Sequence, residues 1–172
     1  MKLVHFMAVA MLVGGLAACK DSDSGNVAGG PGGGSGAGNG YESTPLGGVQ
    51  TGDVASASAE LKNSVGDTVR FGYDSSDIAP EARSILQRQA AFMQRYQNLT
   101  FTIEGHCDER GTREYNLALG ERRATSAKNA LISLGVSAQR LTTISYGKER
   151  PVAVGSNDAV WAQNRRAVTV VN

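Results

Sequence analysis

Hydrophobic and polar positions follow regular periods only from about residue 64 onward, where they predict alternating strands and helices. Alternation with a period of two predicts four strands, over residues 68–73, 99–105, 141–146 and 166–171. Apolar positions three and four residues apart predict two helices and a helical turn, over residues 80–97, 113–134 and 159–164. This order predicts an α/β two-layer sandwich with right-handed crossovers between parallel strands.

The ends and faces of these elements carry consistent signals. Pro80 and Glu81 are typical of a first helical turn, Thr112 is a suitable N-cap for the second helix, and Gly135 closes that helix. Three side chains of the second strand are expected to point inward: Leu99, Phe101 and Ile103. The apolar stripes of the two helices are Ala82, Ile85, Leu86, Met93 and Tyr96, and then Tyr115, Leu119, Ala127, Ala130 and Leu134.

Glycine is unevenly distributed. The chain has 22 glycines among 172 residues, and twelve of them lie between Gly25 and Gly52. Such a stretch buries too little apolar surface to offset the entropy lost on folding, so residues 19–62 are expected to form a flexible tether. A short helix over 53–61 is considered within it. The folded domain is expected to span residues 63–172.

The charge balance narrows the function classes. Lys and Arg number 17 and Asp and Glu number 16. A net charge so close to zero gives no support to a general binder of nucleic acids or other polyanions.

Residues 1–18 have the pattern of a secretory signal, in which Lys2 precedes an apolar run over 6–16 that is too short to span a bilayer. The run ends in Leu-Ala-Ala-Cys19, which resembles the cleavage motif of bacterial lipoproteins. The resemblance implies cleavage before Cys19, a diacylglycerol on its sulfur and an acylated amino terminus, enough for stable anchoring. Lys20 then implies the outer membrane, with the domain in the periplasm. The alternative is an ordinary signal peptide followed by a chance cysteine.

The chain has two cysteines, Cys19 and Cys107. If Cys19 carries lipid, Cys107 has no partner, so no intrachain disulfide is expected in an oxidising compartment. Cys107 is in phase with Ile103 and Gly105 of its strand, which favours a small buried thiol.

One charged residue interrupts the apolar stripe of the second helix. Arg123 is in phase with Leu119 and Ala127, so its guanidinium must be paired or must line a cleft. Gly120, one turn earlier, costs ~1 kcal/mol relative to Ala inside a helix. That cost favours a close approach of another backbone, or of a ligand, near Arg123.

The loop before this helix supplies the opposite charge. Asp108 follows the second strand, next to the N–H groups of Gly111, Thr112 and Arg113 at the helix start, where anions are favoured. An anion, a cation and N–H donors in one cleft fit a zwitterion, with Asp108 for an ammonium and Arg123 and the helix start for a carboxylate. Periodicity leaves open the alternative that Asp108 caps the helix and forms a salt bridge with Arg123.

The loop and the helix together carry a clear resemblance. Residues 106–124, HCDERGTREYNLALGERRA, resemble the central motif of the OmpA-like peptidoglycan-binding domain family. Further matches lie at 71–74 (FGYD), 144–151 (ISYGKERP) and 164–168 (NRRAV). Together they extend from about residue 66 to the end of the sequence, and the lipoprotein motif at Cys19 agrees with them.

The resemblance implies non-covalent binding of the peptidoglycan stem peptide at its meso-diaminopimelate, whose side chain ends in an amino acid zwitterion. By position, Asp108 and Arg123 match the principal ligand contacts. The other contacts implied are Tyr73, Asp74, Arg110, Gly111, Thr112, Asn116 and Leu119. The resemblance also implies the Tol-Pal envelope and cell-division system, with TolB and the Tol complex as partners on an overlapping surface. No cofactor is expected apart from the lipid on Cys19.

Three other functions are considered. An enzyme that uses His106 and Cys107 is disfavoured because adjacent strand residues point to opposite faces and form no nucleophile–base pair. A metal site of Glu104, His106 and Asp108 is disfavoured because same-face positions on one strand chelate poorly. The last alternative is an OmpA-like peptidoglycan-binding lipoprotein outside the Tol-Pal system.

Overall fold

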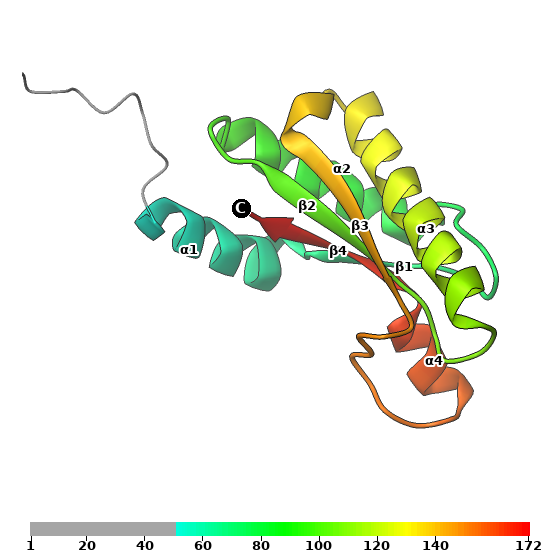
Figure 1. Cartoon of the computed structure of the whole chain (residues 1–172). Helices are drawn as coiled ribbons and strands as arrows, with labels where there is room; N and C mark the ends of the chain where they lie inside the picture. The colour runs from blue at the N-terminus through cyan, green and yellow to red at the C-terminus, as the bar shows by residue number, and fades with distance from the viewer. Residues whose placement is uncertain (1–50) are drawn as a thin grey trace, which may run out of the picture. The chain divides into compact units, whose positions relative to one another are not determined.

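The computed structural model describes residues 51–172, which form a four-stranded sheet with helices packed against it (Figure 1). The signal peptide, Cys19 and the tether up to residue 50 lie outside the described residues, and what the sequence predicts for them stays a prediction. Among the helices of residues 51–172, none is long and apolar enough to cross a membrane.

The sheet has the strand order β1-β4-β2-β3. The four strands are β1 (Thr68–Arg70), β2 (Phe101–His106), β3 (Leu141–Gly147) and β4 (Arg166–Val171). β2 and β3 run parallel, whereas β4 is antiparallel to both of its neighbours, β1 and β2. The last strand therefore inserts between two strands that precede it in the sequence. The predicted α/β sandwich is confirmed.

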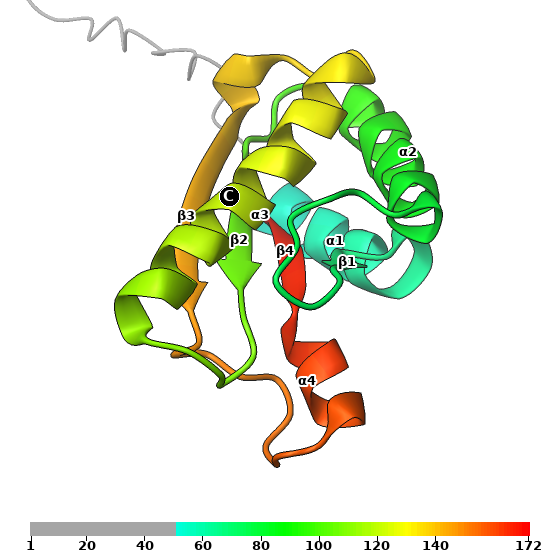
Figure 2. The same ribbon diagram turned by 90° about the vertical axis from the view of Figure 1, so that its right-hand side faces the viewer.

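Two long helices, α2 (Pro80–Arg95) and α3 (Arg113–Ser133), lie side by side on one face of the sheet (Figures 1 and 2). A 3-10 turn (Ala138–Arg140) leads into β3, and α4 (Asp158–Asn164) leads into β4. Gly135 follows the end of α3 with a left-handed φ of 93°, as its sequence position predicts. Most of the side chains predicted to face inward are buried: Ala82, Leu86, Met93, Leu99, Phe101, Ile103, Leu119 and Ala127.

The folded part begins before the predicted boundary at residue 63. Helix α1 spans Thr51–Glu60 and continues as a π-helical turn over Leu61–Val65. Ala57 and Leu61 are buried in the core, and α1 packs against β4. The predicted short helix is therefore present, but the assignment of residues 51–62 to the tether was wrong. The physical reason is that β1 is short. Its three residues pair only with Arg166–Val168, and the rest of β4 is covered by α1 instead of by a longer strand.

Two aromatic residues lie at the surface instead, Tyr73 from the predicted first strand and Tyr115 from the apolar stripe of the second helix. β1 ends at Arg70, and the chain then turns at Asp74, whose φ of 50° is left-handed, so Tyr73 lies outside the strand with 67% of its surface exposed. Tyr115 is 46% exposed because the first turn of α3 faces this loop, to which its hydroxyl donates a hydrogen bond at Asp74.

α3 approaches β2 more closely than side chains allow. A Cβ built on Gly105 of β2 would lie 1.9 Å from the carbonyl oxygen of Gly120 in α3. A Cβ on Gly120 would lie 2.3 Å from Ser145 Oγ. The sequence left open whether Gly120 marks the close approach of another backbone or of a ligand; the backbone approach is confirmed, and the partner is Gly105. This contact brings Arg123, one turn further along α3, onto the end of β2.

On the opposite face of the sheet, β2 ends in a buried histidine. His106 is 2% exposed, its ring stacks on Tyr146 with centroids 5.5 Å apart, and its Nε2 lies 3.5 Å from Glu104 Oε2. Within residues 51–172 neither ring nitrogen has a hydrogen-bond partner. Burial, and then the positive charges of Arg166 and Arg150, lower the pKa of His106 to about 4. The side chain is therefore neutral at pH 7.

We predict that Gly105→Ala strongly destabilises the protein, because the added methyl group meets backbone that has no rotamer with which to yield. The expected loss is ~3 kcal/mol or more in the free energy of unfolding, measured by urea denaturation. Gly52→Ala is the matched control, since a Cβ on Gly52 of α1 meets nothing within 4 Å. Equal stability of the two variants would contradict the close contact.

We predict that His106 makes the fold acid-sensitive. Its pKa in the folded state is about 4, below the ordinary value of 6.5, so the unfolded chain binds a proton first as the pH falls. Stability from this group is complete above pH 6.5 and is lost between pH 6.5 and about 4, by up to ~3 kcal/mol. Urea denaturation from pH 7.5 to 4 should show a smaller decline for His106→Gln. Parallel curves for both proteins would refute this assignment.

Candidate functional site: a charged cavity at the start of helix α3

A cavity of about 240 Å³ lies where β2 ends and α3 begins. Its walls come from the loop after β1, the loop between β2 and α3, and the first turns of α3. The lining residues are Tyr73, Asp74, Cys107, Asp108, Arg110, Gly111, Tyr115, Asn116, Leu119 and Arg123. The cavity thus brings together eight of the nine residues predicted to contact a ligand. The ninth, Thr112, does not line the cavity but lies at the N-terminus of α3.

The loop between β2 and α3 is held in shape by side chains from outside it. All four carbonyl oxygens of residues 109–112 accept N–H groups of side chains. Asn116 Nδ2 donates to the carbonyl oxygens of Arg110 and Thr112, at 2.8 and 3.0 Å. Lys148 Nζ donates to those of Glu109 and Gly111, at 3.2 and 2.7 Å. Thr112 caps α3, as predicted, because its Oγ1 accepts a bond of 3.2 Å from Tyr115 N.

Arg123 lines the cavity from a buried position, with 1% of its surface exposed. Its guanidinium donates to three backbone carbonyls: Nε to Ser75 at 2.9 Å, Nη1 to His106 at 2.9 Å and Nη2 to Gly72 at 3.0 Å. Burial lowers the pKa of Arg123, although the guanidinium stays charged at any pH relevant to a folded protein. Arg123 therefore joins the loop after β1 to the end of β2.

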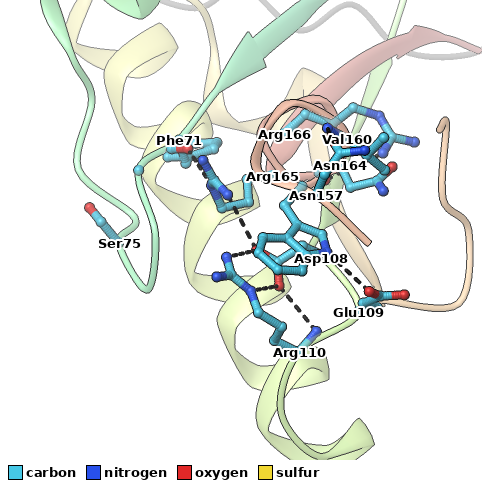
Figure 3. Close-up of polar contacts among 12 residues, drawn as sticks. Phe71, Ser75, Asp108, Glu109, Arg110, Asn157, Val160, Asn164, Arg165 and Arg166 are labelled. Atoms are coloured by element: carbon cyan, nitrogen blue, oxygen red, sulfur yellow. Dashed lines mark hydrogen bonds and ion pairs between the residues drawn. The ribbon is translucent and has the colours of Figure 1, made fainter. Parts of the chain in front are cut away.

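Asp108 is also buried, at 5% exposure, and its carboxylate is paired. Arg110 forms a fork with it, Nε to Oδ1 at 3.1 Å and Nη2 to Oδ2 at 2.6 Å, and the backbone N–H of Arg110 adds a bond of 3.1 Å (Figure 3). Arg165 Nη1 lies 3.4 Å from Oδ2. Burial raises the pKa of Asp108, but the bonds from Arg110 outweigh burial and hold the pKa below its ordinary value.

These partners decide one alternative that the sequence left open. The bonds of Asp108 go to Arg110 and Arg165, and those of Arg123 go to backbone carbonyls, so the alternative of an Asp108–Arg123 salt bridge was wrong. Capping by Asp108 was wrong as well, because Thr112 is the N-cap of α3. Sequence periodicity missed this because the partners are set by the conformation of a loop.

Arg110 is enclosed by aromatic rings. Its Cζ lies 4.2 Å from the centre of the Tyr73 ring and 4.0 Å from that of Trp161. Trp161, in α4, is positioned by its Nε1, which donates to Glu109 Oε1 at 3.0 Å. The guanidinium side chain keeps 32% of its surface exposed. A partly exposed cation thus forms the outer wall of the cavity beside the buried Asp108.

Several residues of the site were missed from the sequence. Tyr115 lines the cavity, although its place in the apolar stripe of α3 predicted the core. Trp161 and Arg165 come from α4 and the residue after it, and no period connects them with Asp108. A signal was available for Trp161, because tryptophan combines a large apolar ring with an N–H donor and is enriched at binding interfaces.

Cys107 is a buried free thiol, as its strand phase predicted, at 2% exposure. Its Sγ donates to the carbonyl oxygen of Asn116 at 3.3 Å. Burial raises the pKa of Cys107, so the thiol is protonated at pH 7. His106 points to the other face of the sheet, where it contacts Tyr146. The two side chains therefore do not form a nucleophile–base pair.

Comparison with known proteins places this geometry in a family. Residues 70–165 match the OmpA family. The peptidoglycan-associated lipoprotein of Brucella melitensis is 55% identical over 116 residues, which cover 67% of this chain and 69% of that protein. The peptidoglycan-associated lipoprotein of Pseudomonas putida is 41% identical over 167 residues, which cover 96% of this chain and 95% of that protein.

Solved structures agree with the sequence relatives. The crystal structure of the peptidoglycan-associated lipoprotein from Burkholderia pseudomallei superposes with a TM-score of 0.63 at 40% identity, covering 66% of this chain and 98% of that chain. The C-terminal domain of Helicobacter pylori MotB has a TM-score of 0.58 at 22% identity, covering 62% of this chain and 84% of that chain, and shows the fold alone. Because residues 70–165 match the family model and the similarity covers nearly the whole Pseudomonas relative, the chain belongs to the OmpA family and, within it, to the peptidoglycan-associated lipoproteins.

Proposed function

We propose that this protein binds peptidoglycan non-covalently through the cavity at the start of α3, where it takes the meso-diaminopimelate of the stem peptide. One observation carries the proposal: Asp108 and Arg123, buried groups of opposite charge, line a single cavity of about 240 Å³. Diaminopimelate ends in an ammonium and a carboxylate on one carbon, so its recognition needs opposite charges in one small site. Relatives named for their association with peptidoglycan support the assignment.

Arg123 is the proposed partner of the ligand carboxylate. A guanidinium has five N–H donors, and three of those on Arg123 bond to carbonyls. The others, together with N–H groups at the start of α3, are available to an anion in the cavity. The low exposure of Arg123 strengthens the attraction, because a buried charge pair is screened less than a pair at the surface.

Asp108 is the proposed partner of the ligand ammonium. The lowered pKa of its carboxyl keeps it ionised at neutral pH, the state that binds a cation. The side chains of Asn116 and Lys148 hold the loop that carries it, so little ordering is needed on binding. Tyr73 and Tyr115, exposed at the rim, extend the surface available to the rest of the peptide.

Binding without chemistry on the ligand is the better proposal. Cys107, the nucleophilic group among the lining residues, is protonated and already donates to a backbone carbonyl. An enzyme would need a base within hydrogen-bond reach of it, and His106 faces away. We therefore assign the protein a mechanical role, which is to hold the cell wall.

The lipoprotein part of the proposal rests on the N-terminal sequence. Lipid on Cys19 anchors the chain in the outer membrane, and the glycine-rich residues that follow allow the domain to reach peptidoglycan in the periplasm. We further propose that the protein works in the Tol-Pal system with TolB as partner. The alternative is an OmpA-like lipoprotein that holds peptidoglycan outside that system.

We predict that Asp108→Asn abolishes co-sedimentation of the purified full-length protein with isolated peptidoglycan. The substitution keeps the shape of the side chain but leaves the ligand ammonium without its counter-charge, a loss of ~2–5 kcal/mol in binding. Arg123→Ala should also abolish binding, and it should lower stability, because three backbone carbonyls, including the buried one of His106, lose their donor.

Two controls accompany this experiment. Asp53→Asn removes the same charge from α1, away from the cavity, and Cys107→Ser alters a neighbour of Asp108 without changing charge. Both variants should sediment with peptidoglycan like the unmodified protein. Undiminished sedimentation of Asp108→Asn would refute the assignment of the cavity, and loss of binding in Cys107→Ser would show that the thiol is not inert.

We predict that the protein retains purified TolB in a pull-down, and that excess stem peptide lowers the amount retained if the two surfaces overlap. The physical reason is that a partner seated over the rim residues Tyr73 and Tyr115 closes the cavity. Absence of any TolB retention would favour the alternative outside the Tol-Pal system, while leaving peptidoglycan binding intact.

A further inference from the structure

The carboxylate that we assign to the ligand ammonium is already occupied in the structure. Arg110 donates three hydrogen bonds to the carboxylate of Asp108 (Figure 3). Its backbone N–H and Nε bond to Oδ1, each at 3.1 Å, and its Nη2 bonds to Oδ2 at 2.6 Å. Arg165 adds a fourth contact at 3.4 Å. A carboxylate has about four lone-pair sites, so these donors leave no room for an ammonium. A cationic ligand group reaches Asp108 only if one of the present partners leaves.

Arg110 is the partner that is able to move. Its side chain is 32% exposed, whereas that of Arg165 is 15% exposed and also donates to the carbonyl oxygen of Phe71 at 3.2 Å. Arg110 has no such backbone bond within residues 51–172, and its guanidinium is otherwise held by the rings of Tyr73 and Trp161. Contacts with ring faces fix no hydrogen-bond direction, so they hold the Arg110 guanidinium less firmly than a bond to a backbone carbonyl would.

We propose that Arg110 is an internal competitor for Asp108 that makes the cavity selective for zwitterions. The inference rests on the proposed function and specifies how its site discriminates. When a zwitterion enters, its ammonium takes the place of the Arg110 guanidinium at Asp108. The guanidinium, still in contact with the rings of Tyr73 and Trp161, turns to the carboxylate attached to the same ligand carbon, which it then shares with Arg123.

The exchange conserves the number of ion pairs. Before binding, Asp108 and Arg110 neutralise each other inside the protein. After binding, each of them faces one charge of the ligand, so no buried charge remains without a partner. The displaced bonds are replaced by bonds of the same charge-assisted kind, and the exchange carries no large desolvation penalty.

Ligands with a single charge do not satisfy this balance. An ammonium alone displaces Arg110 and leaves its guanidinium unpaired beside two other cations, Arg123 and Arg165. A carboxylate alone reaches Arg123, but it must compete with Asp108 for the second cation, Arg110. Both ligands therefore bind more weakly than the zwitterion. The preference comes from Arg110, and it disappears when the competitor is removed.

The test compares three stem tripeptides that differ only at the far end of the third residue. The first ends in the zwitterion of meso-diaminopimelate, the second in the ammonium of Lys, and the third in the carboxylate of 2-aminopimelate. Each is titrated by calorimetry into the purified full-length protein and into Arg110→Gln. Arg110→Lys is a second variant, because it keeps a competing cation. Arg83→Gln, an exposed change on α2, controls for net charge.

In the unmodified protein and in Arg83→Gln, we expect the diaminopimelate peptide to bind at least ~10-fold more tightly than either analogue. In Arg110→Gln, its affinity falls about 10-fold, because the carboxylate loses a charged donor. The affinity of the Lys peptide rises by about 3-fold or more, because Asp108 is vacated. In Arg110→Lys, the Lys peptide gains nothing. Opposite changes for two ligands in one variant cannot result from unfolding.

Two results overturn the inference. Equal losses for all three peptides in Arg110→Gln would make Arg110 a structural residue, and an unchanged preference would show that it does not discriminate. Failure of the proposed function gives a different result, in which the unmodified protein does not bind the diaminopimelate peptide at all. In that case the site assignment itself falls, and the inference falls with it.

Discussion

The enclosed guanidinium of Arg123 is the interaction on which the cavity depends. It bonds to carbonyls of Gly72 and Ser75, in the loop after β1, and of His106, at the end of β2, although about thirty residues separate these segments. Charge-assisted bonds to three carbonyls make the burial of a cation tolerable. The loop that carries Tyr73 and Asp74 is thereby fixed at a set distance from the loop that carries Asp108. The two walls of the cavity are one hydrogen-bonded unit.

That unit depends in turn on the approach of two backbones. Gly105 and Gly120 let α3 sit directly on β2, and so Arg123 reaches the strand end with its whole side chain enclosed. On the other side of the cavity a second arginine, Arg110, is held by rings and by Asp108 rather than by backbone. The part of the cavity held by Arg123 is therefore rigid, whereas Arg110, on the other side, is the group that we propose to move. This division suits the proposed function, in which the cavity keeps its shape when empty and admits a charged peptide on binding.

Much of this arrangement was predictable from the sequence, because its main elements leave local signals. An arginine in an apolar helical stripe and a glycine one turn before it pointed to the correct helix and to its close contact. Strand alternation placed Cys107 in the core and Asp108 at the strand end. The strand order was beyond such reasoning, since the insertion of β4 between β1 and β2 is a pairing between distant segments. Arg165 was missed as a partner of Asp108 for the same reason, since it lies 57 residues away. Arg110 lies only two residues away, and it was missed because the conformation of the loop decides which side chains meet.

The sequence also did not predict that α1 belongs to the folded domain, and the position of this helix has a mechanical consequence. α1 packs beside the end of β4 that carries Val171, whereas the cavity and α4 lie at the opposite end of the sheet, where β4 begins at Arg166 (Figure 1). A pull transmitted through the chain before Thr51 and a pull on a ligand in the cavity would act at opposite ends of the strands. The hydrogen bonds of the sheet would then be loaded together in shear, not opened one at a time as in a zipper. In the proposed function, the hydrogen bonds of the sheet would therefore oppose separation together.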